Sequence, residues 1–236
     1  MTEVTESEVG GGAALRERLR ADAGFYAASY CEENVARRLA ALPAAERRRS
    51  FALVISNARR AVAVAHQHAG DASRGGLVVW DYHVIALSLS EGEAGSGSGW
   101  LAWDLDSTLL PFPAPARAYL SASFPPGTRE QHRACFRLAG ADLFLARFAS
   151  TRRHMRGEDG ESWLAPPPAW PCLQGADAEG GCGDNLALWL PPAAAGGAAT
   201  NVDAGYGADA LGADALIALL ERVSQQRGAK SGGVAE

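Results

Sequence analysis

Apolar residues in the middle of the chain gather in short runs of the length typical of β-strands. Runs over 51–55 and 61–65 predict two neighbouring strands, and apolar stretches over 77–89 and 100–105 predict an antiparallel pair. The intervening segment 91–99 contains only Glu, Gly, Ala and Ser. This composition suits a flexible connection that lets the second strand fold back on the first.

Three other segments have the spacing of helices. Residues 31–42 carry apolar side chains on one face, and Ser29 is the expected N-cap. Residues 141–150 and 211–223 are also predicted to be helical, the second as a terminal amphipathic helix. The whole pattern predicts an α/β protein in which helices pack on an antiparallel sheet.

Strand alternation brings a histidine toward two acids. On the first strand of the predicted pair, Asp81 and His83 share a face, and on the second Asp104 and Asp106 share a face. Folding the connection back places His83 in the neighbourhood of both Asp104 and Asp106. Alternation alone does not separate these two acids.

Length and composition are those of an ordinary globular protein. The chain has 236 residues, of which 47% are hydrophobic and 21% charged, enough for one domain with a sizeable core. We expect a flexible N-terminal segment over 1–20, a single catalytic domain over 21–225 and a flexible tail over 226–236.

Charge and hydropathy argue against nucleic-acid and membrane partners. The formal net charge is −5 and the basic runs are short, so no electrostatic footprint for nucleic acid is present. Apolar stretches are too short to cross a bilayer, and the acidic start does not resemble a signal segment. We therefore expect a soluble intracellular protein.

Cysteine usage fits a reducing compartment. The four cysteines, Cys31, Cys135, Cys172 and Cys182, are too sparse for a disulfide scaffold. The last two lack the close spacing of a zinc site, so no metal and no cofactor are predicted. Cys135, Cys172 and Cys182 are assigned structural roles.

Cys31, His83 and Asp104 have the residue types of a cysteine hydrolase. A thiolate attacks a carbonyl, a histidine moves the proton, and an acid orients the histidine. Cys31 opens the predicted helix, where exposed N–H groups favour a thiolate and lower a thiol pKa from about 8.5 toward roughly 3.5–7.5. Taken singly, each residue also fits a structural role, so the surrounding motifs decide.

Those motifs resemble the family of protein N-terminal glutamine amidohydrolases. The segments are Tyr30-Cys31-Glu32-Glu33-Asn34, Ile55-Ser56-Asn57, Trp80-Asp81-Tyr82-His83-Val84 and Asp104-Leu105-Asp106. Later segments continue the match: Leu110-Pro111-Phe112-Pro113, Phe148-Ala149-Ser150 with Arg152, His154 and Met155, and Pro166-Pro167-Pro168 leading to Pro171-Cys172. The resemblance covers roughly residues 26–172.

The resemblance implies a papain-like or transglutaminase-like fold and conversion of an N-terminal glutamine to glutamate. Cys31 would be the nucleophile, His83 the general base and then acid, and Asp104 the orienting acid, because it matches the first acid of the family's Asp-Leu-Asp motif. Proteins or peptides with N-terminal glutamine would be the partners, upstream of N-terminal arginylation and degradation. We expect a cytoplasmic monomer, with nuclear access left open.

Selection of a chain's first residue requires an acceptor for its free ammonium. Glu32, Glu33 and Asp81 are candidates, although the glutamates also suit the first turn of a helix and Asp81 a backbone contact. His154 is a candidate for the substrate cleft by resemblance. The aromatic residues near the motifs are expected to serve in packing: Trp80, Tyr82, Trp100 and Trp103.

Two alternative functions stay open at this point. A thioester on Cys31 could be intercepted by an amine, giving acyl transfer, or the site could cleave peptide bonds. A different class is a non-catalytic module that binds protein N-termini. An intact Cys31, His83 and Asp104 count against the second alternative.

Overall fold

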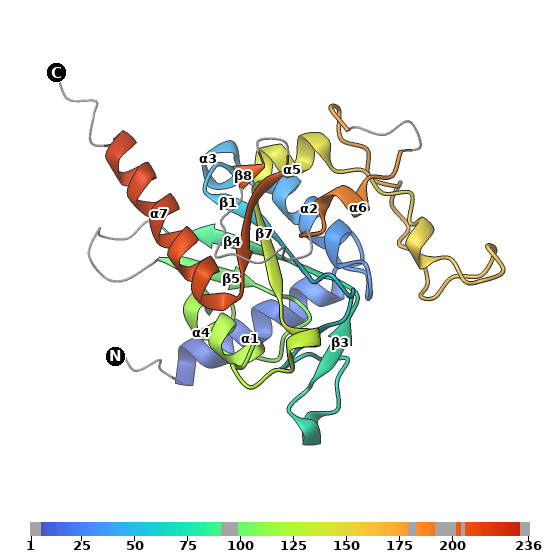
Figure 1. Cartoon of the computed structure of the whole chain (residues 1–236), viewed down its shortest axis with the longest axis horizontal. Coiled ribbons are helices and arrows are strands. Elements are labelled where there is room, and N and C mark those ends of the chain that lie inside the picture. Colours follow the sequence, from blue (N-terminus) through green and yellow to red (C-terminus); the bar gives the residue numbers. More distant parts are fainter. Residues whose placement is uncertain (1–5, 91–98, 179–182, 192–201, 204–205, 232–236) are drawn as a thin grey trace.

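The computed structural model describes residues 6–90, 99–178, 183–191, 202–203 and 206–231. Its centre is an antiparallel sheet in the order β6-β5-β4-β1-β7-β9-β8 (Figure 1). Its strands are β1 Ser50–Ser56, β4 His83–Leu89, β5 Trp100–Trp103, β6 Ala114–Pro115, β7 Cys135–Gly140, β8 Val202–Asp203 and β9 Gly207–Leu211. A separate two-stranded sheet pairs β2 Val62–Val64 with β3 Val78–Trp80.

Helices cover both faces of the large sheet. One face packs with α4 Ala116–Ser123 and α7 Ala213–Ser231, around Leu53 and Ile85 of the central strands. The other packs with α2 Cys31–Ala41, α5 Ala141–Arg147 and α6 Leu186–Trp189, around Val54 and Val84. Because successive residues of a strand point to opposite faces, β1 and β4 contribute to both cores. The fold is therefore mixed α/β, with an antiparallel sheet between helical layers.

A helix near the N-terminus is held against the rest of the chain by polar contacts. α1 Glu6–Ala21 occupies most of the segment 1–20 that was expected to be flexible. Arg16 donates to the carbonyl of Leu109 over 3.0 Å, and Arg20 donates to Asp106 over 3.0 Å. These arginines hold the helix against the chain that follows β5. At the other end, α7 continues to Ser231, past the start of the expected tail at 226.

Most of the predicted elements are confirmed. The helices predicted over 31–42, 141–150 and 211–223 correspond to α2, α5 and α7. The predicted antiparallel pair is β4 and β5, with Ala86 opposite Trp103 and Leu89 opposite Trp100. Residues 91–98 of the predicted connection lie outside the described part of the chain.

Two local predictions are wrong. The runs over 51–55 and 61–65 are not paired with each other, because both edges of β1 are taken by β4 and β7, and β2 pairs with β3 instead. The apolar stretch over 77–89 is two strands separated by Asp81 and Tyr82. Asp81 consequently lies outside the strand that begins at His83.

The remaining short elements complete the description. They are α3 Ala44–Arg47, η1 Ala72–Arg74, η2 Glu130–His132 and η3 Arg153–Met155. None of the helices in the described ranges combines the length and apolarity needed to cross a membrane.

Candidate active site

His83 and Asp104 meet where two neighbouring strands end. His83 is the first residue of β4 and Asp104 follows the last residue of β5. Nε2 of His83 lies 3.0 Å from Oδ1 of Asp104, and both side chains are buried. An ionised carboxylate only accepts hydrogen bonds, so Nε2 carries the proton and Nδ1 is the basic atom.

Asp104 is surrounded by donors. Oδ1 also accepts from the backbone N–H of Asp106 at 2.9 Å, and Oδ2 accepts from Gln67 Nε2 at 3.0 Å and Tyr119 Oη at 2.8 Å. Burial acts to raise the pKa of Asp104, but His83 and these hydrogen bonds outweigh it and hold the pKa below its usual range. Asp104 is therefore a carboxylate at neutral pH.

The pKa of His83 depends on burial and on its contact with Asp104. Burial acts to lower its pKa, whereas the charge and hydrogen bond of Asp104 raise it, and the net result is a raised pKa. The indole of Trp80 stacks near the imidazole, with ring centroids 6.2 Å apart and planes inclined by 16°. The imidazole is thus held in one tautomer and one orientation.

The turn before α2 fixes the position of Cys31. The carbonyl of Tyr30 accepts from the backbone N–H groups of Glu33 and Asn34 at 3.1 and 2.9 Å, which starts the helix at Cys31. Asn34 also holds the preceding chain through both the N–H and the carbonyl of Ala27. Ser29 has a φ of 69° and is not the N-cap; that position is Tyr30, which makes no side-chain cap bond.

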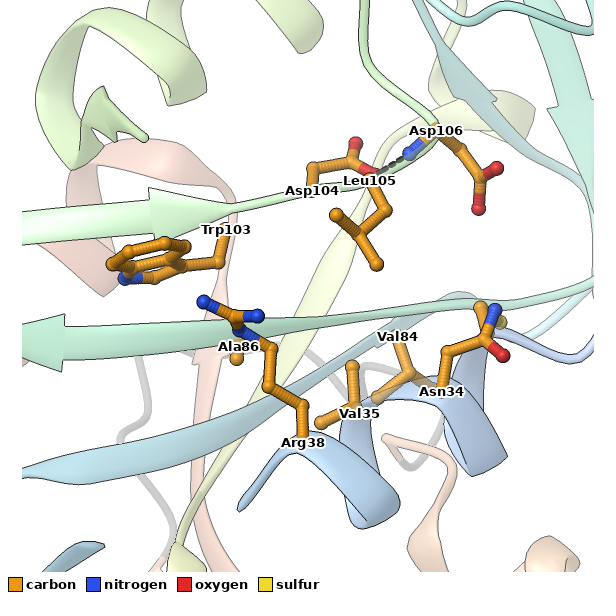
Figure 2. A pocket seen from close by; sticks show the side chains of 10 residues that line it. Asn34, Val35, Arg38, Val84, Ala86, Trp103, Asp104, Leu105 and Asp106 are labelled. Atoms are coloured by element: carbon orange, nitrogen blue, oxygen red, sulfur yellow. Dashed lines mark hydrogen bonds between the residues drawn. The ribbon is translucent and has the colours of Figure 1, made fainter. Parts of the chain in front are cut away.

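Cys31 lies beside the point where β5 separates from β4. The β4–β5 pairing begins at Ala86 and Trp103, so it does not include Val84, and the backbone of Val84 lies close enough to Cys31 to act toward lowering the pKa of its thiol. Cys31, Asp104 and Asp106 line one narrow pocket of about 10 Å³. Figure 2 shows Asp104 and Asp106 beyond the end of β5 in this pocket.

The thiol of Cys31 is directed at Glu32 rather than at His83. Its Sγ lies 3.7 Å from Oε2 of Glu32, and in the described part of the chain it makes no direct hydrogen bond to His83. Burial raises the pKa of the thiol well above its usual value, and the charge of Glu32 raises it further. This is opposite to the lowering expected from the helix start, since desolvation and a neighbouring acid dominate.

Asp106 belongs to a different set of contacts. Its Oδ1 accepts from Tyr26 Oη at 2.6 Å and from Arg20 at 3.0 Å. The geometry therefore separates the two acids that strand alternation left equivalent: Asp104 contacts His83, and Asp106 contacts the N-terminal segment.

His83, Asp104 and Asp106 also place potential metal-ligand atoms within 4.8 Å of one another. Both oxygens of Asp104, however, accept two hydrogen bonds each, and Asp106 Oδ1 accepts two. The lone pairs of Asp104 that a cation would need are therefore already used. The arrangement suits proton transfer better than metal binding.

Two of the three ammonium-acceptor candidates have structural partners. Glu33 is held by Arg152 at 2.7 and 2.8 Å and by Trp170 Nε1 at 2.6 Å. Asp81 is exposed and accepts from the backbone N–H of Tyr82 at 2.9 Å. The Asp81 contact is the backbone contact considered for this residue, whereas Glu33 serves in a buried ion pair that was not predicted.

Glu32 is different from both of them. It is fully buried, burial raises its pKa to about 7, and its Oε1 has no hydrogen-bond partner. His154 Nε2 lies 3.5 Å from this oxygen and 2.8 Å from Tyr82 Oη. The predicted cleft residue His154 thus lies beside Glu32, on the side of Cys31 to which the thiol points.

No pattern in the sequence pointed to Gln67 or Tyr119 as partners of Asp104. They come from the segment after β2 and from α4, far from Asp104 along the chain, and neither stands in a recognisable motif. A buried glutamine and a buried tyrosine are ordinary core residues until the fold places them.

Of the other cysteines, Cys135 and Cys172 are free thiols and Cys182 lies outside the described residues.

Comparisons with known proteins identify the family of this chain. The profile of the N-terminal glutamine amidase family matches residues 26–197. Relatives named protein N-terminal glutamine amidohydrolase include those of Bos taurus, 35% identical over 71% of this chain and 79% of its own, and Homo sapiens, 34% over 71% and 80%. The Arabidopsis thaliana relative is 41% identical over 60% of this chain and 64% of its own. The chain belongs to the N-terminal glutamine amidase family.

Proposed function

We propose that this protein hydrolyses the side-chain amide of an N-terminal glutamine in proteins or peptides, leaving glutamate and releasing ammonia. The observation that carries the proposal is the buried His83–Asp104 pair next to a cysteine at a helix start. Family membership supports the same reaction, since the relatives are named for it.

Cys31 is the proposed nucleophile and His83 the group that moves protons. The thiol turns from Glu32 toward the imidazole and gives its proton to Nδ1, and the thiolate attacks the carboxamide carbon. The C–N bond then breaks, His83 protonates the leaving nitrogen, and a thioester on Cys31 remains. A water molecule then gives a proton to His83 and attacks the thioester carbon. The C–S bond breaks, glutamate is released, and His83 returns the proton to the sulfur of Cys31.

Asp104 holds His83 ready for both transfers. Its Oδ1 keeps the proton on Nε2, so Nδ1 can act as base, and its charge stabilises the imidazolium that forms. The hydrogen bonds from Gln67 and Tyr119 keep Asp104 ionised in spite of burial. Asp104 orients and stabilises His83 and does not itself take the proton.

The start of α2 supplies stabilisation for the oxyanion. Negative charge develops on the carboxamide oxygen during attack, next to the N-terminal end of the helix that begins at Cys31. The backbone N–H of Cys31 is the proposed donor, and one such donor contributes about 2.7–4 kcal/mol to the transition state.

We also propose that the architecture is papain-like or transglutaminase-like. The support is a cysteine that opens a helix packed on an antiparallel sheet, with the histidine and the acid at neighbouring strand ends. The monomeric state and the cytoplasmic location stay predictions, and light scattering tests the first.

The decisive experiment offers the purified protein a peptide beginning with glutamine, its N-acetylated copy and a peptide with only an internal glutamine. Mass spectrometry and ammonia detection should show deamidation of the first alone. Cys31→Ala should fold and be inactive. Equal hydrolysis of all three peptides would exclude terminal selectivity, and a cleaved backbone or amine adduct would favour peptidase or acyl-transfer chemistry. Absence of any product from wild-type protein would favour the binding module.

A further inference from the structure

Glu32 is a buried acid with an unused oxygen. The described part of the chain contains four buried acids: Glu32, Glu33, Asp104 and Asp209. Glu33 pairs with Arg152, Asp104 with His83, and Asp209 with Arg137 at 2.7 and 2.9 Å. Glu32 alone among them has a carboxylate oxygen without a hydrogen bond. Because a buried polar atom without a partner is costly, this oxygen needs an explanation.

The neighbouring histidine does not satisfy Glu32. His154 lies 3.5 Å from Oε1, but burial lowers its pKa, so the ring is neutral at pH 7. Its Nε2 is 2.8 Å from the hydroxyl of Tyr82. The hydroxyl of Tyr82 also lies within hydrogen-bonding reach of Glu32. It has one proton for the two neighbouring acceptors, and neither it nor the neutral ring brings a positive charge to the carboxylate. The buried Nδ1 of His154 also lacks a partner, so the polar cluster is incomplete.

The other charged groups around Glu32 do not supply a cation. On α2, Glu33 carries the same sign of charge and is occupied by Arg152. Before β4, Asp81 is also acidic and Tyr82 is a neutral phenol whose pKa burial raises. A cation supplied from outside the protein would therefore meet an acceptor whose neighbours, the Tyr82 hydroxyl and the Cys31 thiol, are neutral donors.

An N-terminal glutamine brings such a cation to this place. Its ammonium nitrogen is four bonds from the carboxamide carbon, so a substrate attacked by Cys31 carries its charge within a few ångströms of the sulfur. Oε2 of Glu32 is 3.7 Å from that sulfur. We propose that Glu32 binds the free ammonium of the substrate and, through the neutralisation of its own charge, releases the Cys31 thiol for ionisation. This inference rests on the proposed function and assigns its specificity to one residue.

Binding and activation are coupled by electrostatics. In the free protein the negative charge of Glu32 adds to burial in raising the pKa of the Cys31 thiol. An ammonium at Glu32 cancels that contribution, and it also replaces the thiol as the partner of the carboxylate. The thiolate then forms when a chain with a free amine is present. An acetylated chain offers neither the charge nor the donor, so the nucleophile stays protonated.

The test compares Glu32→Gln with Glu32→Asp and with the matched variant Asp106→Asn. Asp106 is a second acid whose charge raises the thiol pKa, but its Oδ1 is already occupied by Tyr26 and Arg20. The measured quantity is kcat/KM for a peptide that begins with glutamine, divided by kcat/KM for its N-acetylated copy. In Glu32→Gln the ratio should fall by at least about 30-fold, as for loss of one partner of a buried charge pair. Glu32→Asp and Asp106→Asn should keep discrimination.

A second readout follows the thiol directly. The ultraviolet absorbance of the thiolate is titrated against pH, with Cys31→Ser subtracted to remove the other cysteines. A peptide beginning with methionine, free at its amine, should lower the pKa of Cys31 in wild-type protein and not in Glu32→Gln. Its acetylated copy should have no effect in either. In the absence of peptide, Glu32→Gln should already have the lower thiol pKa.

The two proposals fail in different ways. If wild-type protein deamidates the free peptide and Glu32→Gln retains the full discrimination, the assignment of Glu32 is overturned and the proposed function survives. If wild-type protein deamidates none of the peptides, the proposed function is wrong and the inference fails with it. Circular dichroism of each variant shows that an altered ratio comes from folded protein.

Discussion

At the scale of single residues, the buried carboxylate of Glu32 lowers the free energy of unfolding when it is ionised. Its pKa rises from 4.5 to about 7 on folding, so between these pH values the folded protein keeps a proton that the unfolded chain has released. The free energy of unfolding therefore falls as pH rises through this window, and the full cost is present above pH 7. Glu32→Gln should stabilise the protein above pH 7 by on the order of 3 kcal/mol.

Urea denaturation at pH 8 and at pH 4.5 measures this difference. The gain should be largest at the higher pH and should shrink at the lower one, where both side chains are neutral. Glu33→Gln is the matched comparison, because Glu33 has a cationic partner in Arg152 and its loss should destabilise the protein at pH 8. A loss of stability in Glu32→Gln at pH 8 would show that the buried carboxylate is satisfied.

Replacing the carboxylate of Asp104 by an amide should strongly reduce the turnover rate. Asp104→Asn keeps the shape, but its amide no longer forces the proton onto Nε2 of His83, and Nδ1 loses its role as base. We expect kcat to fall by about 10³–10⁴-fold. Steady-state deamidation rates measure the loss, and Asp106→Asn should lose much less because Asp106 does not contact His83. Equal losses in the two variants would contradict the assignment of Asp104.

At the scale of elements, one buried ion pair fastens the chain after α5 to α2. Arg152 donates to both oxygens of Glu33 and to the carbonyl of Trp170 at 2.8 Å. Arg152→Ala would leave Glu33 buried without a cation, which should cost about 3–5 kcal/mol of unfolding free energy. The exposed neighbour supplies the control: Arg153→Ala should change stability by less than about 0.5 kcal/mol. Urea denaturation distinguishes these outcomes, and similar values would contradict a structural role for the pair.

Elements with a strong local pattern were predictable, and their long-range partners were not. The apolar periodicity of α2 and the adjacent apolar runs of β4 and β5 were sufficient to place His83 near the acids. The pairing of β2 with β3 was missed because an apolar run does not encode which strand edge is free. The helix α1 was missed because contacts of Arg16 and Arg20 to distant loop atoms stabilise it, and its own apolar pattern is weak.

The site shows the same division. The family motifs located Cys31, His83 and Asp104, but Gln67 and Tyr119 reach Asp104 only through tertiary packing. The direction in which the pKa of Cys31 is shifted could not be predicted from the sequence either. A helix start favours a thiolate, and only the fold reveals that burial and Glu32 outweigh this effect. The lowering of a thiol pKa by a helix start is expected for a thiol in solvent, whereas Cys31 is surrounded by protein.

At the scale of the whole molecule, the sheet separates a core under Cys31 from a core under the C-terminal helix. Leu216 on α7 is fully buried in the second core, on the face opposite α2. Leu216→Ala should therefore lower the free energy of unfolding by about 2–5 kcal/mol. The kcat of the folded fraction should stay unchanged, because the helix that carries Cys31 packs on the other face. Urea denaturation and turnover below the unfolding transition measure the two effects.

An exposed residue on the same face of the sheet provides a control for Leu216→Ala. Arg117 and Glu221 form an exposed ion pair at 2.9 Å between α4 and α7. Since exposed pairs contribute at most about 1 kcal/mol, Arg117→Ala should leave stability nearly unchanged. If Leu216→Ala lowered kcat while the protein remained folded, the two cores would be coupled through the sheet, and the positions of His83 and Asp104 would depend on packing on both of its faces. If kcat held while stability fell, the catalytic geometry would be a local property of the splayed ends of β4 and β5.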